Sequence, residues 1–97
     1  MNWRPPDTKV AVIRRYLMTS FPGTDISDGT DFDTLSQFFT VRAPHAATYR
    51  GAVSREVFDD FSDGQIDRLL RTHDLADEMR TAAPRRVTLT TTGCRIV

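Results

Sequence analysis

Two residues of this 97-residue chain have the types and the spacing of an acid-base couple. They are His73 and Asp77, which would lie on one face of a helix, where an imidazole and a carboxylate can share a proton or ligate a metal ion. The sequence offers no third ligand beside them, and His73 also falls on the apolar stripe of its helix. We therefore interpret His73 as a packing residue and keep a small enzyme built on this pair as a third alternative.

The other candidate nucleophiles lack activating partners in the sequence. The single cysteine, Cys94, excludes an internal disulfide and has no neighbouring residue that would activate it. Ser54 and Ser62 stand where helix caps are expected, without the flanking glycines of a nucleophile elbow. Because the chain also lacks a phosphate-binding glycine loop and a cysteine pair for zinc, we expect no enzyme, no catalytic residue, no cofactor and no metal site.

A run of four aspartates invites a calcium-binding hypothesis. The calcium-binding helix-loop-helix motif needs glycine at its sixth position and glutamate at its twelfth. Counted from Asp25, those positions hold Thr30 and Ser36. We therefore interpret this segment as an acidic loop, with the pair Asp28-Gly29 as a turn between two short extended pieces. The four residues are Asp25, Asp28, Asp31 and Asp33.

Apolar periodicity predicts one helix near the N-terminus and three strands. Apolar residues recur at spacings of three and four from about Thr8 to Ser20, which indicates an amphipathic helix. Residues 36–42 and 47–53 are rich in β-branched and aromatic residues and predict two antiparallel strands. Residues 87–92 alternate as a final strand, which we expect Gly93 to end before a C-terminal tail.

Helix signals fill the stretch between the second and the final predicted strand. Ser54 can cap a short helix that runs to about Phe61. Ser62 and Gln65 have the spacing of a capping box, which predicts a longer helix that continues to Pro84.

These elements predict a single α+β domain over residues 1–97. A chain of this length fits a single domain of common size and can bury enough surface to fold alone. Amphipathic helices need an apolar surface to cover, so we expect them on one face of a three- to four-stranded antiparallel or mixed sheet.

The net charge of zero conceals a separation of acidic and basic residues along the chain. Residues 37–55, which hold the two central strands, carry three arginines and no acidic residue. The helical stretch that follows is strongly acidic, and the C-terminal part is basic again. Because side chains on a strand alternate between the two faces, the arginines should share the sheet face that the helices leave open. The predicted binding residues on that face are Phe38, Arg42, Arg50 and Arg86.

Two functions fit this charge pattern. An arginine- and threonine-rich sheet face can dock on an acidic protein, and the acidic helix can dock on a basic one or on a second copy of the chain. We therefore expect a small, non-enzymatic binding or regulatory protein that acts through protein contact. The alternative is a module for single-stranded nucleic acid, with a base stacked on Phe38 and phosphates on the arginines.

The composition indicates the compartment in which the protein works. No apolar run approaches the roughly 20 residues that span a bilayer, and the first residues lack the apolar core of a secretory signal. We therefore expect no membrane partner and a cytoplasmic location. Arginine supplies all the basic residues except Lys9, which hints at a GC-rich bacterial or phage genome.

Overall fold

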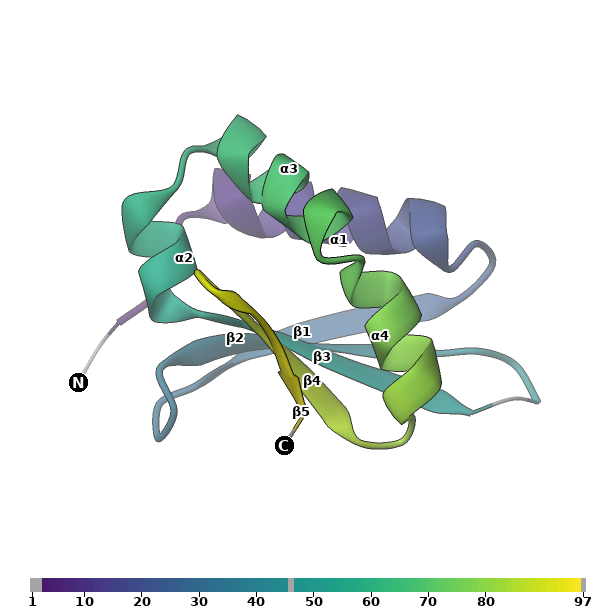
Figure 1. The fold of residues 1–97 in the computed structure, drawn as a ribbon. Helices are drawn as coiled ribbons and strands as arrows, with labels where there is room; N and C mark the ends of the chain where they lie inside the picture. The colour runs from purple at the N-terminus through teal and green to yellow at the C-terminus, as the bar shows by residue number, and fades with distance from the viewer. Residues whose placement is uncertain (1–2, 46, 97) are drawn as a thin grey trace.

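The protein folds as one layer of helices over one mixed β-sheet. The computed structural model describes residues 3–45 and 47–96. Figure 1 shows the helices together on one side of the sheet. In chain order the elements are α1 (Asp7–Ser20), β1 (Asp25–Asp31), β2 (Ser36–Arg42), β3 (Thr48–Ser54), α2 (Arg55–Asp60), α3 (Asp63–Thr72), α4 (Leu75–Ala82), β4 (Arg86–Thr90) and β5 (Gly93–Ile96).

The five strands lie in the sheet in their sequence order, β1-β2-β3-β4-β5. Neighbouring strands are antiparallel except β3 and β4, which are parallel. A parallel pair requires a crossover connection, and α2, α3 and α4 form it. The expected α+β class and mixed sheet are confirmed, with five strands in the described residues instead of three to four.

The core lies between the helices and the inner face of the sheet. The apolar positions of α1, α3 and α4 meet alternate residues of the central strands, as the periodicity predicts. The residues buried completely include Ile13, Leu17, Val41, Val53, Ile66, Leu70, Met79, Val87 and Leu89. Within the described part of the chain, no helix has the length and apolar character that crossing a membrane requires.

The long helix predicted from Ser62 to Pro84 is wrong in one respect, because it is two helices. Its start is confirmed: Ser62 and Gln65 form the capping box. The helix then breaks at Asp74, whose φ of 51° lies in the left-handed region. The break allows α3 to pack on α1 while α4 turns down onto β3 and β4, as Figure 1 shows.

The predicted turn at Asp28-Gly29 is also wrong, because β1 runs through both residues. Gly29 pairs with Phe38 on β2, and the chain reverses after Asp31. A side chain at Gly29 would collide with the Phe38 ring, since an added Cβ would lie 2.5 Å from its Cζ atom. The glycine therefore provides space for an aromatic ring on the neighbouring strand. In the sequence alone, a glycine in this position resembles a turn signal.

The C-terminal segment expected to be a tail is the edge strand β5. Gly93 does not end the sheet but begins a strand that pairs with β4, Cys94 opposite Leu89 and Arg95 opposite Thr88. The reversal between β4 and β5 uses the positive φ of 136° at Gly93, which a residue with a side chain rarely adopts. This strand places Arg95 on the sheet beside Thr88.

Candidate functional site on the outer sheet face

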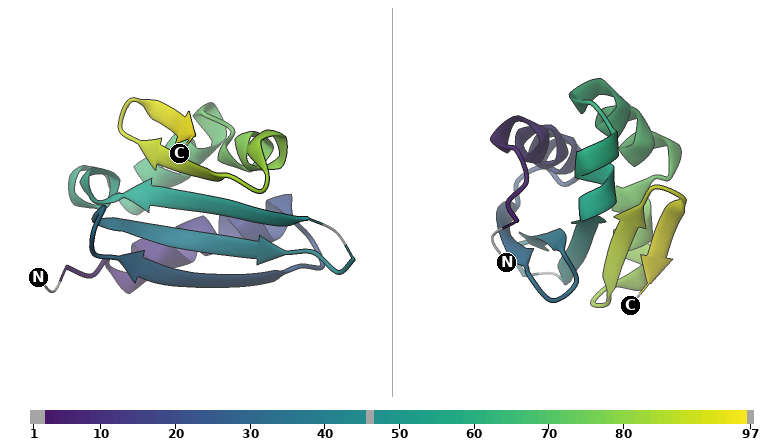
Figure 2. Two further views of the ribbon diagram at one scale, coloured as in Figure 1. Left: turned by 90° about the horizontal axis from the view of Figure 1, so that it is seen from below. Right: turned by 90° about the vertical axis from the view of Figure 1, so that its left-hand side faces the viewer.

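The sheet face that points away from the helices is uncovered, as Figure 2 shows from below. We call it the outer face. Thr40 on β2 lies opposite Arg50 on β3, and Arg50 lies opposite Arg86 on β4. Alternation then places Phe38 and Arg42 on the same face as Thr40. The arginine pattern in the sequence therefore predicts residues that the fold brings to one surface.

All four predicted binding residues line one shallow hollow of the outer face, about 230 Å³ in volume. We call it the arginine hollow. Its lining residues are Phe38, Phe39, Thr40, Arg42, Arg50, Gly51 and Arg86.

Within the arginine hollow, Phe38 is not a free aromatic platform. Its ring packs against Gly29, and the guanidinium carbon of Arg86 lies 5.5 Å from the ring centroid. Arg86 is held there by Asp31, whose Oδ2 atom lies 3.3 Å from Nη1. The ring and one of the three arginines are thus engaged within the protein.

Arg42 and Arg50 differ from Arg86 because both side chains are exposed. Arg42 lies opposite Thr48, two positions from Arg50, so the two arginines are diagonal neighbours on adjacent strands. The nearest carboxylate by register is Asp25, the cross-strand neighbour of Arg42. Within residues 3–45 and 47–96, neither arginine forms an ion pair.

A second hollow of about 360 Å³ lies on the outer face beyond Arg86. We call it the hydroxyl hollow, because serine and threonine side chains from three strands line most of it. This hollow was not predicted from the sequence, because Arg95 follows Gly93 as a tail residue would and Ser54 stands where a helix cap is expected. The one sequence signal that points to this hollow is the alternation of the polar residues Arg86, Thr88 and Thr90 along β4. The lining residues are Thr34, Ser36, Ser54, Glu56, Arg86, Thr88, Thr90 and Arg95.

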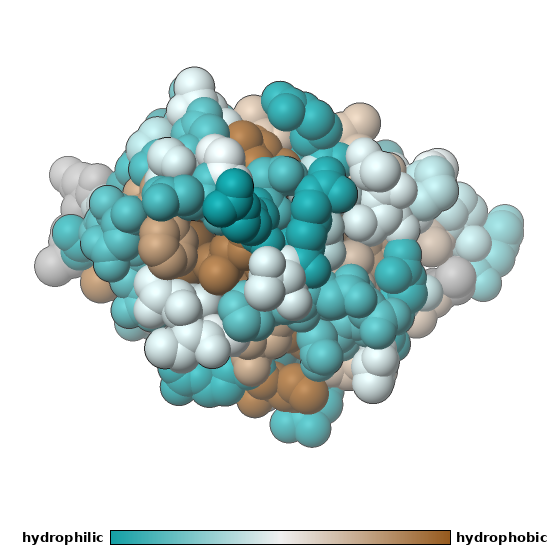
Figure 3. Space-filling model, turned by 45° about the horizontal axis from the view of Figure 1, so that its top comes forward, coloured by the Kyte–Doolittle hydropathy of each residue, from teal (hydrophilic) through white to brown (hydrophobic). Residues whose placement is uncertain are grey.

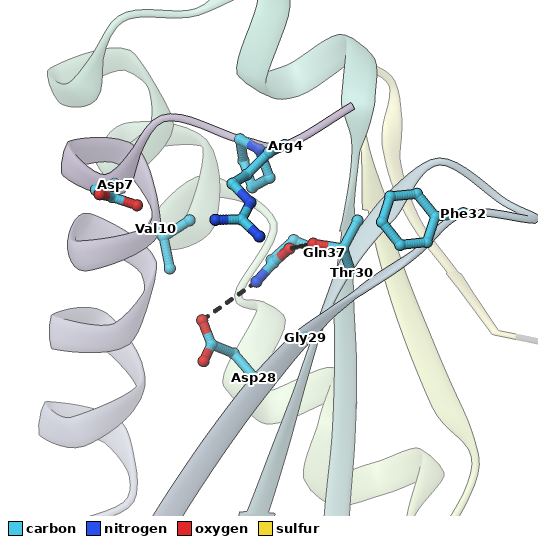
Figure 4. Close-up of a pocket in the computed structure, with 9 residues that line it drawn as sticks. Arg4, Asp7, Val10, Asp28, Gly29, Thr30, Phe32 and Gln37 are labelled. Atoms are coloured by element: carbon cyan, nitrogen blue, oxygen red, sulfur yellow. Dashed lines mark hydrogen bonds between the residues drawn. The ribbon is translucent and has the colours of Figure 1, made fainter. Parts of the chain in front are cut away.

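A third hollow, of about 430 Å³, lies on the helix side of the sheet between the N-terminal segment and β1 and β2. Figure 4 shows Arg4 directing its guanidinium into this space above Gln37. The buried amide of Gln37 accepts a hydrogen bond from the Thr30 hydroxyl at 2.7 Å and donates one to Asp28 at 3.2 Å. Asp28 also lies 3.7 Å from Arg14. Thr30, Gln37, Asp28 and Arg14 thus form one connected polar network beside this hollow, and none of them was predicted as a binding residue.

The acid-base couple kept as a third alternative is separated by the break between α3 and α4. His73 follows the last residue of α3, and Asp77 lies exposed on α4, so the i, i+4 relation on one helix does not exist. His73 instead packs near Gly93, and its carbonyl oxygen accepts a weak hydrogen bond from the Cys94 thiol at 3.8 Å. Burial raises the pKa of this thiol to about 11, so it is protonated at neutral pH. No group of three or more potential metal ligands occurs among the described residues.

In the helical layer, α2, α3 and α4 provide a second surface with an excess of acidic residues. Figure 3 shows this side of the molecule as mostly hydrophilic, with small hydrophobic patches between the polar residues. Two ion pairs with i, i+4 spacing, Arg55 with Asp59 and Arg71 with Asp67, neutralise part of the charge. The exposed acidic residues of this layer include Asp59, Asp60, Asp63, Asp74 and Asp77.

Comparisons of this chain with protein-family models, with curated proteins and with solved structures gave no match.

Proposed function

We propose that the protein is a small, non-enzymatic binding module that recognises an acidic segment of a partner protein through its outer sheet face. One observation carries the proposal: the exposed, diagonally placed Arg42 and Arg50 beside the arginine hollow. Diagonal neighbours on adjacent strands lie about 7–8 Å apart at their Cα atoms. Two guanidiniums at that separation can bind two carboxylates of one extended segment, each with paired N–H donors.

Two features favour a protein partner over a single-stranded nucleic acid. The Phe38 ring is occupied by Gly29 and Arg86, which hinders the stacking of a base. The sequence pI of about 6.7 also lacks the basic excess of most nucleic-acid-binding domains. Nucleic acid remains the alternative, and the experiment below distinguishes the two.

The partner can be another protein or a second copy of the chain. The acidic helical layer lies on the opposite side of the molecule from the outer face, so contact between two copies would join unlike surfaces. The half-buried, unpaired cysteine Cys94 fits a reducing compartment such as a bacterial cytoplasm, where we place the protein.

A double substitution tests the proposal. Arg42→Ala with Arg50→Ala removes two positive charges from the outer face, and Arg15→Ala with Arg68→Ala removes two exposed ones from α1 and α3. The probe is a fluorescein-labelled glutamate-rich peptide, followed by fluorescence anisotropy at low salt. We expect the first variant to lose about tenfold or more in affinity, because it loses two charge-assisted contacts, and the control to bind as the wild type does.

The competing outcomes are distinct. Equal loss in both variants would show that only overall charge matters and would overturn the assigned surface. A single-stranded oligonucleotide that binds more tightly than the peptide, with the loss confined to the first variant, would establish the nucleic-acid alternative instead. If neither probe binds the wild type at low salt, both functions are wrong for this face.

A further inference from the structure

The hydroxyl hollow contains hydrogen-bond donors that the fold itself does not use. Its walls come from the start of β2, the end of β3, the first turn of α2, and the strands β4 and β5. Only Arg86 is shared with the arginine hollow. The two hollows therefore lie side by side on the outer face but present different chemistry.

Thr88 lines this second hollow from β4. On β4 it lies two positions after Arg86, so both side chains project from the same face, and across the strand pair it lies opposite Arg95. Its hydroxyl makes no hydrogen bond to any residue that the structure describes. An uncommitted hydroxyl thus lies on the same sheet face as Arg86 and Arg95, which line the same hollow.

The two guanidiniums keep donors for a ligand. Asp31 engages Arg86 through one terminal nitrogen, Nη1, which leaves further N–H groups of a five-donor guanidinium. Arg95 is exposed on the edge strand and forms no ion pair within the described ranges. The Asp31 contact also fixes the position of Arg86, which lowers the entropic cost of binding a ligand there.

The remaining walls are polar and largely fixed by internal contacts. Ser36 and Thr90 are only 3% and 6% exposed. Ser36 is hydrogen-bonded to Thr34 at 2.8 Å, and Thr90 donates to the carbonyl of Gly93 at 3.0 Å. The surroundings of the free donors are therefore shaped before any ligand arrives.

We propose that the hydroxyl hollow binds a phosphate monoester. A phosphate group presents several strong acceptors and a double negative charge, which suits a hollow lined by two arginines and a free hydroxyl. Arg86 and Arg95 each bind a phosphate oxygen, and the Thr88 hydroxyl donates a hydrogen bond to a third phosphate oxygen. A volume of about 360 Å³ is within the usual range for small-molecule sites. The site does not depend on Arg42 or Arg50, and so it goes beyond the function proposed above.

The carboxylate of Glu56 indicates what the organic part of the phosphate ester should carry. A carboxylate beside a phosphate is unfavourable by charge, yet Glu56 lines the same hollow, with the Ser54 hydroxyl donating to it at 3.4 Å. A hydroxyl on the organic part of the ester can donate to this carboxylate, whereas bare inorganic phosphate cannot. The site should therefore prefer a hydroxyl-bearing ester, such as a polyol phosphate, to the inorganic ion.

Backbone amide shifts in two-dimensional NMR test the proposal with defined probes. The titrants are sodium phosphate, glycerol 3-phosphate, and a phosphoserine peptide with its unphosphorylated counterpart, each at constant ionic strength set by sodium chloride. We expect saturable shifts at residues 54–56, 88–90 and 94–95. Arg95→Met should weaken binding about tenfold and Thr88→Val about threefold, because one charged and one neutral donor are lost.

Two further variants complete the test. Arg15→Ala with Arg68→Ala on the helical side should leave the affinity for glycerol 3-phosphate unchanged, and Glu56→Gln should raise the affinity for inorganic phosphate about threefold by removing a like charge. Tighter binding of glycerol 3-phosphate supports a small-molecule ligand, and tighter binding of the phosphopeptide supports a phosphorylated segment as the source of the same group. Shifts that sodium chloride alone reproduces, or a loss caused by the Arg42 and Arg50 substitutions but not by Arg95→Met, would overturn the site.

Discussion

Arg86 and Asp31, which are 55 residues apart in the chain, form an ion pair of 3.3 Å across the outer face of the sheet. Both side chains remain partly exposed, so the pair itself adds little to the free energy of unfolding. The effect of the ion pair is to fix the position of the Arg86 side chain. It holds a guanidinium over the Phe38 ring, at the boundary between the two hollows of the outer face.

The first prediction concerns the titration of Asp31. The pKa of its carboxyl is lowered from 3.8, chiefly because the backbone N–H of Thr34 donates to the carboxylate, with Arg86 a minor cause. A lowered folded pKa stabilises the fold above the unfolded pKa, and this contribution is lost as pH falls through the folded value. We expect the ¹³C carboxyl resonance of Asp31 to titrate below 3.8 in the wild type and still below 3.8 in Arg86→Ala. A return to 3.8 in that variant would make the ion pair the main cause.

The second prediction concerns the close contact between Gly29 and Phe38. Gly29→Ala would place a Cβ 2.5 Å from the ring, which must shift from its place under Arg86. We expect the free energy of unfolding in urea to fall by about 1–3 kcal/mol. Phe38→Leu in the same chain should recover part of this loss.

Gly64→Ala is the matched control for the Gly29 substitution. Gly64 lies in α3 with open space at its Cβ position, so alanine there should raise stability by about 0.5–1 kcal/mol. If both alanine substitutions changed the stability equally, the ring contact would not be the reason for glycine at position 29.

The third prediction concerns Tyr16, which caps α4 from another helix. Asp74 precedes α4 but its side chain makes no capping bond; instead the backbone N–H of Ala76 donates to the Tyr16 hydroxyl at 3.0 Å. Tyr16→Phe leaves this buried donor unpaired and should cost about 1–2 kcal/mol in urea unfolding. Tyr49→Phe is the control and should change the stability by less than about 0.5 kcal/mol. Equal effects would show that the cap is unimportant.

The fourth prediction concerns the reactivity of Cys94. Because burial raises the pKa of its thiol to about 11, only a small fraction is thiolate at pH 8. We expect iodoacetamide to modify the native protein at least about tenfold more slowly than free cysteine at that pH. The rate should rise steeply towards pH 11 and reach the free-cysteine value in urea. Fast modification of the native protein at pH 8 would contradict the structure around β5.

The local parts of the fold could be read from the sequence because their signals are local. The capping box at Ser62 and Gln65 marks a helix start through contacts within one turn. Alternation along β2, β3 and β4 assigned Phe38, Arg42, Arg50 and Arg86 to one face, because strand geometry alone decides which side chains share a side.

Other features depended on contacts between distant segments, which no local pattern contains. The break at Asp74 follows from α3 packing on α1 and α4 packing on the sheet, although the apolar periodicity runs through it unbroken. Gly29 resembles a turn residue until the ring of Phe38 is placed beside it.

The amino-acid sequence by itself determined the element types, the polar face of each strand and the separation of charge. Tertiary structure alone decided which of those charges are free to bind. Asp31 engages one terminal nitrogen of Arg86 only because the sheet brings β1 and β4 within reach, and Arg95 joins Thr88 only because the last residues pair as β5. Alternation is a property of one strand, whereas the neighbours of a guanidinium are set by the order and twist of all five.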